Sequence, residues 1–239
     1  MSISFYTATQ GVMKMQEALD ITANNVANVS TNGFKPLRAS FSDLIYTVRN
    51  DKSKDVEVGH GVKIDKTDLM YDIGSMSNTE RQLDFATPTE GLFAFQRADG
   101  QTVYSKNGAF SISDINGQWT LVDAKGSKVL DYTGKPITVT KDEKDNIDTN
   151  AVLNSIGVYK FSNPYGLKAD GDNYYLATAS SGAAAADQNL EKRSGFLEAS
   201  SSNIADQMVK VIQYQRAFSF NTKMVQTADD IENIVNNLR

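Results

Sequence analysis

The 239-residue sequence contains no cysteine, a single histidine, a single tryptophan and only four prolines. The lack of cysteine excludes disulfide bonds, thiolate nucleophiles and cysteine-ligated zinc or iron–sulfur centres. With His60 as the single imidazole, a two-histidine metal site is excluded as well. His60 stands between Gly59 and Gly61, a pattern that favours a surface turn over an active-site loop.

Long apolar runs and an excess of positive charge are also missing. No apolar stretch approaches the ~20 residues of a membrane span, and no signal peptide opens the chain, so we expect no transmembrane segment. The 24 basic and 29 acidic residues give a net charge of −5, which argues against a nucleic-acid-binding surface. The acidic excess lies in the middle of the chain, and the two ends are nearly neutral. Neutral ends can pack against each other, or against further copies, without strong repulsion.

The motifs of the common enzyme classes are absent from the sequence. It has no phosphate-binding loop, no dinucleotide fingerprint and no Gly-x-Ser-x-Gly elbow. The acidic stretch 142–148 lacks the glycine and the closing glutamate of an EF-hand, so an acidic surface turn is expected there. We therefore predict a protein that is not an enzyme, with no catalytic residue, cofactor or metal, whose work is assembly.

Both ends of the chain show the periodicity of helices. Near the N-terminus the apolar residues follow a heptad pattern, with one column formed by Phe5, Val12, Leu19 and Val26. The Asn-rich stretch and Gly33 then predict the end of that helix. Near the C-terminus Ser200–Asn203 offer an N-cap. The apolar stripe that follows, with one shift of register, comprises Ile204, Met208, Val211, Phe218, Val225, Ile231 and Val235.

These stripes allow two interpretations. Two amphipathic helices could pack on a local globular core, which is the commoner arrangement. Alternatively, the helices could form a coiled coil with each other and with neighbouring chains. We favour the second interpretation, because the two longest stripes lie at opposite ends of the chain and carry little charge.

The middle of the sequence predicts β-structure. Short alternating segments at 92–96, 102–105, 109–112 and 118–122 are separated by Asx-Gly and Lys-Gly turns, which is typical of hairpins. Further strands are expected at 137–140, 157–161 and 174–177. The charged segment 50–61 and the small-residue run 180–186 are expected to be loops. The predicted fold is α+β, with long terminal helices in a coiled-coil layer and a β-rich middle domain.

Several stretches resemble the bacterial flagellar rod and hook proteins. The stretch Ala23–Lys35 is similar to that family's Asn-rich helix end followed by Thr-x-Gly-Phe. Three others agree in order: Leu83–Ala86 with Glu90–Phe93, Tyr104–Phe110, and Leu197–Ser200 with the helix that follows. Leu92 departs from the usual phenylalanine, and the charged stretch after Asp43–Tyr46 is shorter than in distal rod proteins. With one middle domain, the chain is similar to the proximal and distal rod proteins.

The resemblance implies a structural subunit of the flagellar basal-body rod. Such subunits are exported by the flagellar type III apparatus to the cell envelope. They self-associate and join other rod and hook subunits in a hollow helical drive shaft that transmits torque to the hook. The implied domains are a terminal helical domain (1–35 and 200–239), a connecting segment (36–82) and a β-rich outer domain (83–199). The implied assembly signature is Asn24, Asn25, Asn28, Gly33 and Phe34.

A second interpretation from another class is a secreted surface or adhesin-like β module with helical ends. It would be a compact monomer, whereas a rod subunit would depend on its neighbours to order its terminal helices.

Overall fold

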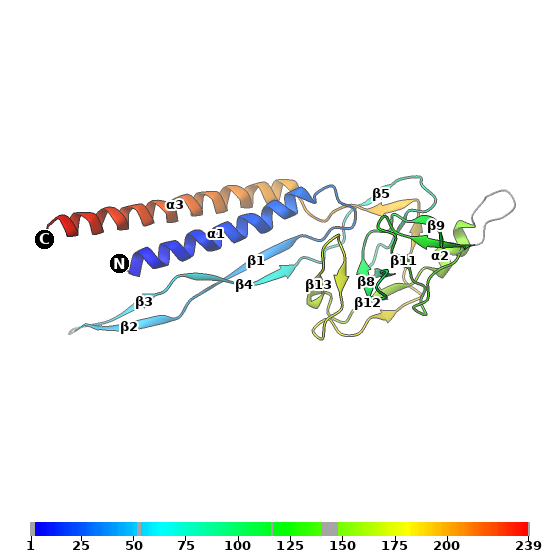
Figure 1. The fold of residues 1–239 in the computed structure, drawn as a ribbon, viewed down its shortest axis with the longest axis horizontal. Coiled ribbons are helices and arrows are strands. Elements are labelled where there is room, and N and C mark those ends of the chain that lie inside the picture. Colours follow the sequence, from blue (N-terminus) through cyan, green and yellow to red (C-terminus); the bar gives the residue numbers. More distant parts are fainter. Residues whose placement is uncertain (1–2, 52–53, 116, 140–147, 239) are drawn as a thin grey trace. The chain divides into compact units, whose positions relative to one another are not determined.

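The computed structural model describes residues 3–51, 54–115, 117–139 and 148–238 (Figure 1). The chain forms two compact units, which are described separately. The terminal unit comprises Met1–Ala27, Leu37–Asp68 and Asn203–Arg239. The middle unit comprises Asn28–Pro36 and Leu69–Ser202. The chain therefore passes between the units four times.

Two long helices dominate the terminal unit. Helix α1 covers Ile3–Ala27 and helix α3 covers Ile204–Asn237, and the two lie side by side (Figure 1). Asn203 is the N-cap of α3, where its side chain accepts a hydrogen bond from the Ala205 amide at 2.9 Å. Both terminal helices were predicted from the sequence, and the N-cap lies within the predicted stretch.

The segment between the second and third passages of the chain, residues 37–68, adds strands to the terminal unit. Strand β1 (Leu37–Asp43) pairs with β4 (Val62–Leu69), and β2 (Tyr46–Asp51) pairs in antiparallel with β3 (Lys54–Gly59). Strand β1 packs against α1, and the ring of Phe41 lies 6.1 Å from that of Tyr214 on α3. The prediction of a loop at 50–61 was wrong. A high charge content does not prevent two neighbouring segments from pairing their backbones across a short connection.

A nine-stranded sheet forms the main body of the middle unit. Its strands run in the order β13–β14–β8–β7–β11–β10–β9, with β12 pairing β7 and β15. Their bounds are β7 Leu92–Gln96, β8 Thr102–Ser105, β9 Ser111–Ile115, β10 Gln118–Val122, β11 Lys128–Val129, β12 Val158–Lys160, β13 Lys168–Ala169, β14 Tyr175–Leu176 and β15 Ala185–Ala186. The strands predicted from the turn signals are thus confirmed, with β9 two residues later than expected. They form the hairpins β7–β8 and β9–β10, but β8 and β9 are not neighbours in the sheet. The prediction of a strand at 137–140 was wrong. Thr138 makes only an isolated bridge to Thr120, and residue 140 lies outside the described residues.

Two shorter pairs and two short helical segments complete the unit. Strand β5 (Met76–Asn78) pairs with β17 (Phe196–Glu198), and β6 (Phe85–Ala86) pairs with β16 (Arg193–Ser194). Helix α2 (Thr149–Ser155) is capped by Asp148, and a 3₁₀ turn covers Pro164–Gly166. The run 180–186 is mostly irregular, as predicted, with β15 at its end. The rest of the predicted acidic turn at 142–148 lies outside the described residues.

An aromatic cluster forms the core of the middle unit. Phe110 lies at its centre, with the rings of Phe93, Phe85 and Phe95 at 5.4, 5.7 and 5.8 Å. Each of these four side chains is at most 1% exposed. Fully burying one phenylalanine contributes about 1.5–3 kcal/mol, so this cluster accounts for a large share of the unit's stability.

Candidate assembly site

The face of α1 that is buried within the chain carries small and polar residues. Its buried positions follow a heptad spacing and are Ala8, Gly11, Ala18, Thr22 and Asn25. The helices approach closely at Gly11, where an added Cβ would lie 2.8 Å from Nδ2 of Asn221. Small residues in this stripe therefore set the distance between α1 and α3.

The apolar column predicted on α1 does not coincide with this buried face. Phe5, Val12, Leu19 and Val26 are all half-buried. Val12, Leu19 and Val26 each follow a member of the small-residue stripe by one position, and Phe5 lies three positions before Ala8. The large side chains of α1 thus keep part of their surface available for other contacts.

Helix α3 buries even less of its surface. Of its 34 residues, Gln207 alone is buried. Val211, Phe218 and Val225 of the predicted stripe are half-buried, and the remaining members are exposed, namely Ile204, Met208, Ile231 and Val235. Gly11 lies beside Asn221, and Asn25 bonds to Gln207, so α1 and α3 run antiparallel. The C-terminal end of α3 extends beyond the N-terminal end of α1 (Figure 1).

The asparagines at the end of α1 differ in their surroundings. Asn25 is 1% exposed, and its amide bonds to both backbone groups of Leu37, at 2.7 and 2.9 Å, and to Oε1 of Gln207 at 3.2 Å. It thus joins the end of α1 to β1 and α3. Asn24 is exposed, and Asn28 is half-buried, with its Oδ1 accepting from the hydroxyl of Thr31.

Gly33 and Phe34 belong to the middle unit and meet its C-terminal segment. Gly33 has a φ of +69°, and a Cβ there would lie 2.7 Å from the backbone of Lys106 and Asn107. Its amide donates to the carbonyl of Glu198 at 2.7 Å, and the Ser201 amide donates to the Phe34 carbonyl at 3.1 Å. The glycine is therefore required both for its backbone conformation and for the close approach of the turn at 106–107.

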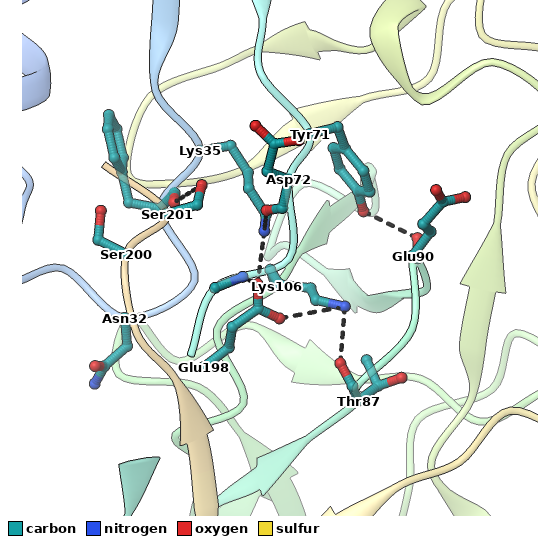
Figure 2. A network of polar contacts seen from close by, with 12 residues as sticks. Asn32, Lys35, Tyr71, Asp72, Thr87, Glu90, Lys106, Glu198, Ser200 and Ser201 are labelled. Atoms are coloured by element: carbon teal, nitrogen blue, oxygen red, sulfur yellow. Dashed lines mark hydrogen bonds and ion pairs between the residues drawn. The ribbon is translucent and has the colours of Figure 1, made fainter. Parts of the chain in front are cut away.

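Next to Gly33 lies a cluster of three buried charges: Lys35, Lys106 and Glu198 (Figure 2). Lys35 Nζ donates to Glu198 Oε1 at 2.6 Å and to the Asp72 carbonyl, and it lies 5.4 Å from the centre of the Tyr71 ring. Glu198 Oε1 also accepts from the Gly74 amide at 2.8 Å. The carboxylate thus joins the segment after α1, the segment at 72–74 and the segment before α3.

Lys106 contributes a second cation to the same carboxylate. Its ammonium group donates to the carbonyls of Thr87, Thr89 and Gly91, which uses all three of its protons. It also lies 3.4 Å from Glu198 Oε2, an atom that accepts no hydrogen bond from the residues that the structure describes. Burial lowers the pKa of Lys106 to about 8, because water no longer stabilises its charge and Glu198 offsets only part of that loss.

The cluster is electrostatically unbalanced, with two lysines facing one glutamate. Burying charges costs several kcal/mol per ion before pairing, whereas removing one partner from a buried pair costs about 3–5 kcal/mol. The cluster is therefore sensitive to the loss of any member. Burial also raises the pKa of Tyr71 and of Tyr175, both of which are close enough to Glu198 to feel its charge.

Sequence reasoning did not select these three residues as a site. Each of them lies inside a stretch quoted for the resemblance, and Lys35 directly follows Phe34. The signal that could have identified them is a charged residue within an otherwise apolar or turn-forming motif. One sequence does not show that three such residues, separated by 71 and 92 positions, meet in space.

Family models and relatives agree on the class of protein. Residues 5–35 match the flagella basal body rod protein model, and residues 193–238 match the model of the flagellar basal body rod FlgEFG protein C-terminal region. Residues 88–158 match the flagellar hook protein FlgE/F/G D1 domain. The flagellar basal-body rod protein FlgG of Borreliella burgdorferi is 35% identical over 99% of this chain and 98% of its own. The FlgG protein of Bacillus subtilis is 30% identical over 99% of this chain and 98% of its own.

The chain belongs to the flagellar basal-body rod family. It is a structural subunit of the rod, located in the flagellar basal body. Membership in a rod and hook family also suggests association with other axial flagellar proteins. The three matched segments of this rod protein contain Lys35, Lys106 and Glu198, one in each.

The described part of the rod subunit lacks two features that its helices and acidic residues could have supplied. None of its helices is long and apolar enough to cross a membrane. Within the same residues, no group of three or more histidine or acidic side chains is arranged to hold a metal ion.

Proposed function

We propose that this rod subunit polymerises through α1 and α3, with copies of itself and with other axial proteins, into a hollow helical shaft that transmits motor torque to the hook. The observation that carries the proposal is the exposed apolar surface of α3. Its large exposed side chains include Ile204, Met208, Val209, Ile212, Phe220, Met224, Ile231, Ile234 and Val235, and the exposed Leu238 follows as the C-cap. So many apolar side chains on one helix mark an interaction surface.

A groove along α3 offers a place for a neighbouring helix. It has a volume of about 500 Å³, and its lining includes the apolar side chains of Ile212 and Phe220 and the cationic side chains of Arg216 and Lys223. A helix from an adjacent axial subunit could cover the apolar part while its acidic residues meet the two cations.

The same proposal includes a division of labour along the chain. Residues 1–35 and 200–239 would form the inner, helical layer, 83–199 the outer domain and 36–82 the connection. The compact units support this division for the helices and the sheet, since both terminal helices share one unit and the β-sheet lies in the other, but they assign 28–36 to the middle unit and 37–68 to the terminal unit. A purely structural role without catalysis is part of the proposal and rests on the structural relatives.

Export through the flagellar type III apparatus is proposed on physical grounds. A helix that buries a single residue gains little from its own chain, and most helical stability in proteins comes from packing. The terminal helices would therefore unfold at small cost before export and become fully ordered only when neighbours cover them.

Asn24 and Asn28 are proposed as contacts that fix the register between neighbouring subunits. Asn24 is exposed and Asn28 is half-buried, one turn apart on α1 and the segment after it. An asparagine that a neighbouring helix covers can set the alignment of a coiled coil. Replacing both by alanine should weaken each interface by about 1 kcal/mol per lost hydrogen bond and shorten the rods.

The central test is Phe220→Asp, with Gln213→Asp as the matched control on the same helix. Phe220 is 67% exposed, so a charge there leaves the isolated chain folded with unchanged circular dichroism. In a strain that lacks the native gene, we expect the variant to be exported but to give no complete rods and no swimming. The control, at an exposed polar position, should swim normally. Normal rods with Phe220→Asp would contradict the proposal.

A further inference from the structure

The four passages of the chain between the two units begin, on the middle-unit side, in three short segments. These segments are 28–36, 69–74 and 198–202. Backbone hydrogen bonds connect them to one another. The Gly33 amide donates to the Glu198 carbonyl at 2.7 Å, the Met70 amide to the Pro36 carbonyl at 2.9 Å and the Ser201 amide to the Phe34 carbonyl at 3.1 Å. Every passage thus starts from one bonded group of segments.

The buried charged side chains form hydrogen bonds with all three segments. Lys35 lies in the first segment, its acceptor Asp72 in the second and its partner Glu198 in the third (Figure 2). Glu198 closes the circle by accepting from the Gly74 amide. Lys106 connects these three segments to the nine-stranded sheet of the middle unit. It directly follows β8, and its ammonium group donates hydrogen bonds to carbonyls of the loop at 87–91.

Stability alone does not account for such a cluster. Well-packed apolar residues of similar volume often stabilise a core at least as well as buried ions do. Hydrogen bonds of buried charges are directional, however, so they favour a single arrangement of the segments that they join. Each of the three segments that match a family model contains one of these charged residues. The cluster therefore joins all three matched parts of the chain.

We propose that Lys35, Glu198 and Lys106 form a clamp that holds the segments 28–36, 69–74 and 198–202 together as one block against the nine-stranded sheet of the middle unit. Force that arrives along any of the four passages then enters the middle unit through the whole block and does not peel one segment away. The mechanical part of this inference rests on the proposed torque-transmitting function. The clamp itself is a property of the single chain.

Hydrogen exchange on the purified full-length chain tests the clamp directly. In Lys35→Met, we expect the amides of Gly33, Gly74 and Ser201 to exchange at least tenfold faster, with Phe93, Val103 and Leu121 in the sheet unchanged. The matched control is Tyr71→Phe, which loses the hydrogen bond to the Glu90 carbonyl but keeps the ring beside Lys35. In the control, the exchange rates of the three amides should change by less than threefold.

Two results would overturn the clamp. One is unchanged exchange of the three amides in Lys35→Met. The other is an equal acceleration throughout the sheet, which would show a general contribution to folding. If the single variant does not fold, the double variant Lys35→Met with Glu198→Gln replaces it. The double variant removes one charge of each sign and leaves Lys106 with its three carbonyl acceptors, and the same two outcomes decide.

A motility assay then tests the mechanical role. In cells that lack the native gene, the double variant should assemble rods of normal length but lose at least half of its swimming speed in viscous medium, relative to wild type. Full speed under load would overturn the mechanical role. If the wild-type chain itself fails to enter rods, the proposed function fails. The exchange experiment still decides on the clamp, because it requires no assembly.

Discussion

The two units of this rod protein bury different kinds of residues. The middle unit encloses four phenylalanines that are at most 1% exposed, whereas the 34-residue helix α3 of the terminal unit buries Gln207 alone. On α1 the buried face consists of small and polar residues, and the large apolar residues flank it. A unit with a closed aromatic core can be stable by itself. A helix pair held by small residues leaves its apolar surface for other subunits.

The largest expected effect is in the aromatic core. Phe93→Ala should lower the free energy of unfolding of the middle unit by about 3–5 kcal/mol, because it removes a buried ring and leaves a cavity. The single tryptophan, Trp119 on β10, reports this transition by fluorescence in a urea titration. Phe220→Ala on α3 is the counterpart at a 67% exposed site. It should leave the urea midpoint of the middle unit equal to that of wild type within error. Equal losses in the two variants would remove the distinction between the units.

A smaller effect is expected from the charge on Lys106. Its pKa is about 8 in the folded chain and 10.5 as the ordinary value, so between these pH values the unfolded state binds more protons. Stability should therefore rise with pH, by about 1–2 kcal/mol between pH 8 and pH 9.5. Above pH 10 the trend should reverse, because Tyr71 and Tyr175 have raised pKa values and keep their protons while the unfolded tyrosines ionise.

Urea midpoints measured at each pH give this profile. Lys192, whose pKa burial also lowers, adds to the rise, so the Lys106→Met variant is the necessary control. The variant should keep only the part of the rise that comes from Lys192. A profile identical to that of wild type would show that Lys106 does not titrate in this range.

The contact between α1 and α3 should respond to a single methyl group. Gly11→Ala brings a Cβ to 2.8 Å from Nδ2 of Asn221, which forces that side chain to move. The displacement should cancel most of the stabilisation of about 0.5–1 kcal/mol that alanine brings to a helix interior relative to glycine. Thermal unfolding followed by helical circular dichroism measures the net change. Adding Asn221→Ala should release that stabilisation by clearing the space, and equal midpoints of the single and the double variant would show that the two residues do not meet.

The smallest effect is expected at the surface of the middle unit. The ion pair between Lys125 and Asp172 spans 3.0 Å, but both side chains are more than half exposed. Lys125→Ala should therefore change the stability of the unit by less than about 0.5 kcal/mol in a urea titration. A loss above 1 kcal/mol would mean that exposed and buried charges of this unit contribute alike.

The position of the apolar stripes illustrates where sequence reasoning succeeded and where it stopped. The heptad period predicted both terminal helices, and the Asx-Gly turns predicted the strands from 92 to 122. The period did not reveal which stripe of α1 faces α3. Residues that are small and residues that are large repeat with the same spacing one position apart, so both stripes fit the pattern. The choice between them depends on how closely the two helices approach.

Interactions between residues close in sequence determined most of the secondary structure. Helix periodicity, caps and tight turns depend on a few neighbouring residues, so they can be recognised in the amino-acid sequence itself. The hairpin of β2 and β3 and the cluster of Lys35, Lys106 and Glu198 were decided by the tertiary structure alone. Backbone pairing does not depend on a hydrophobic pattern, and the energy of a buried charge depends on which groups the rest of the chain brings within about 3 Å of it.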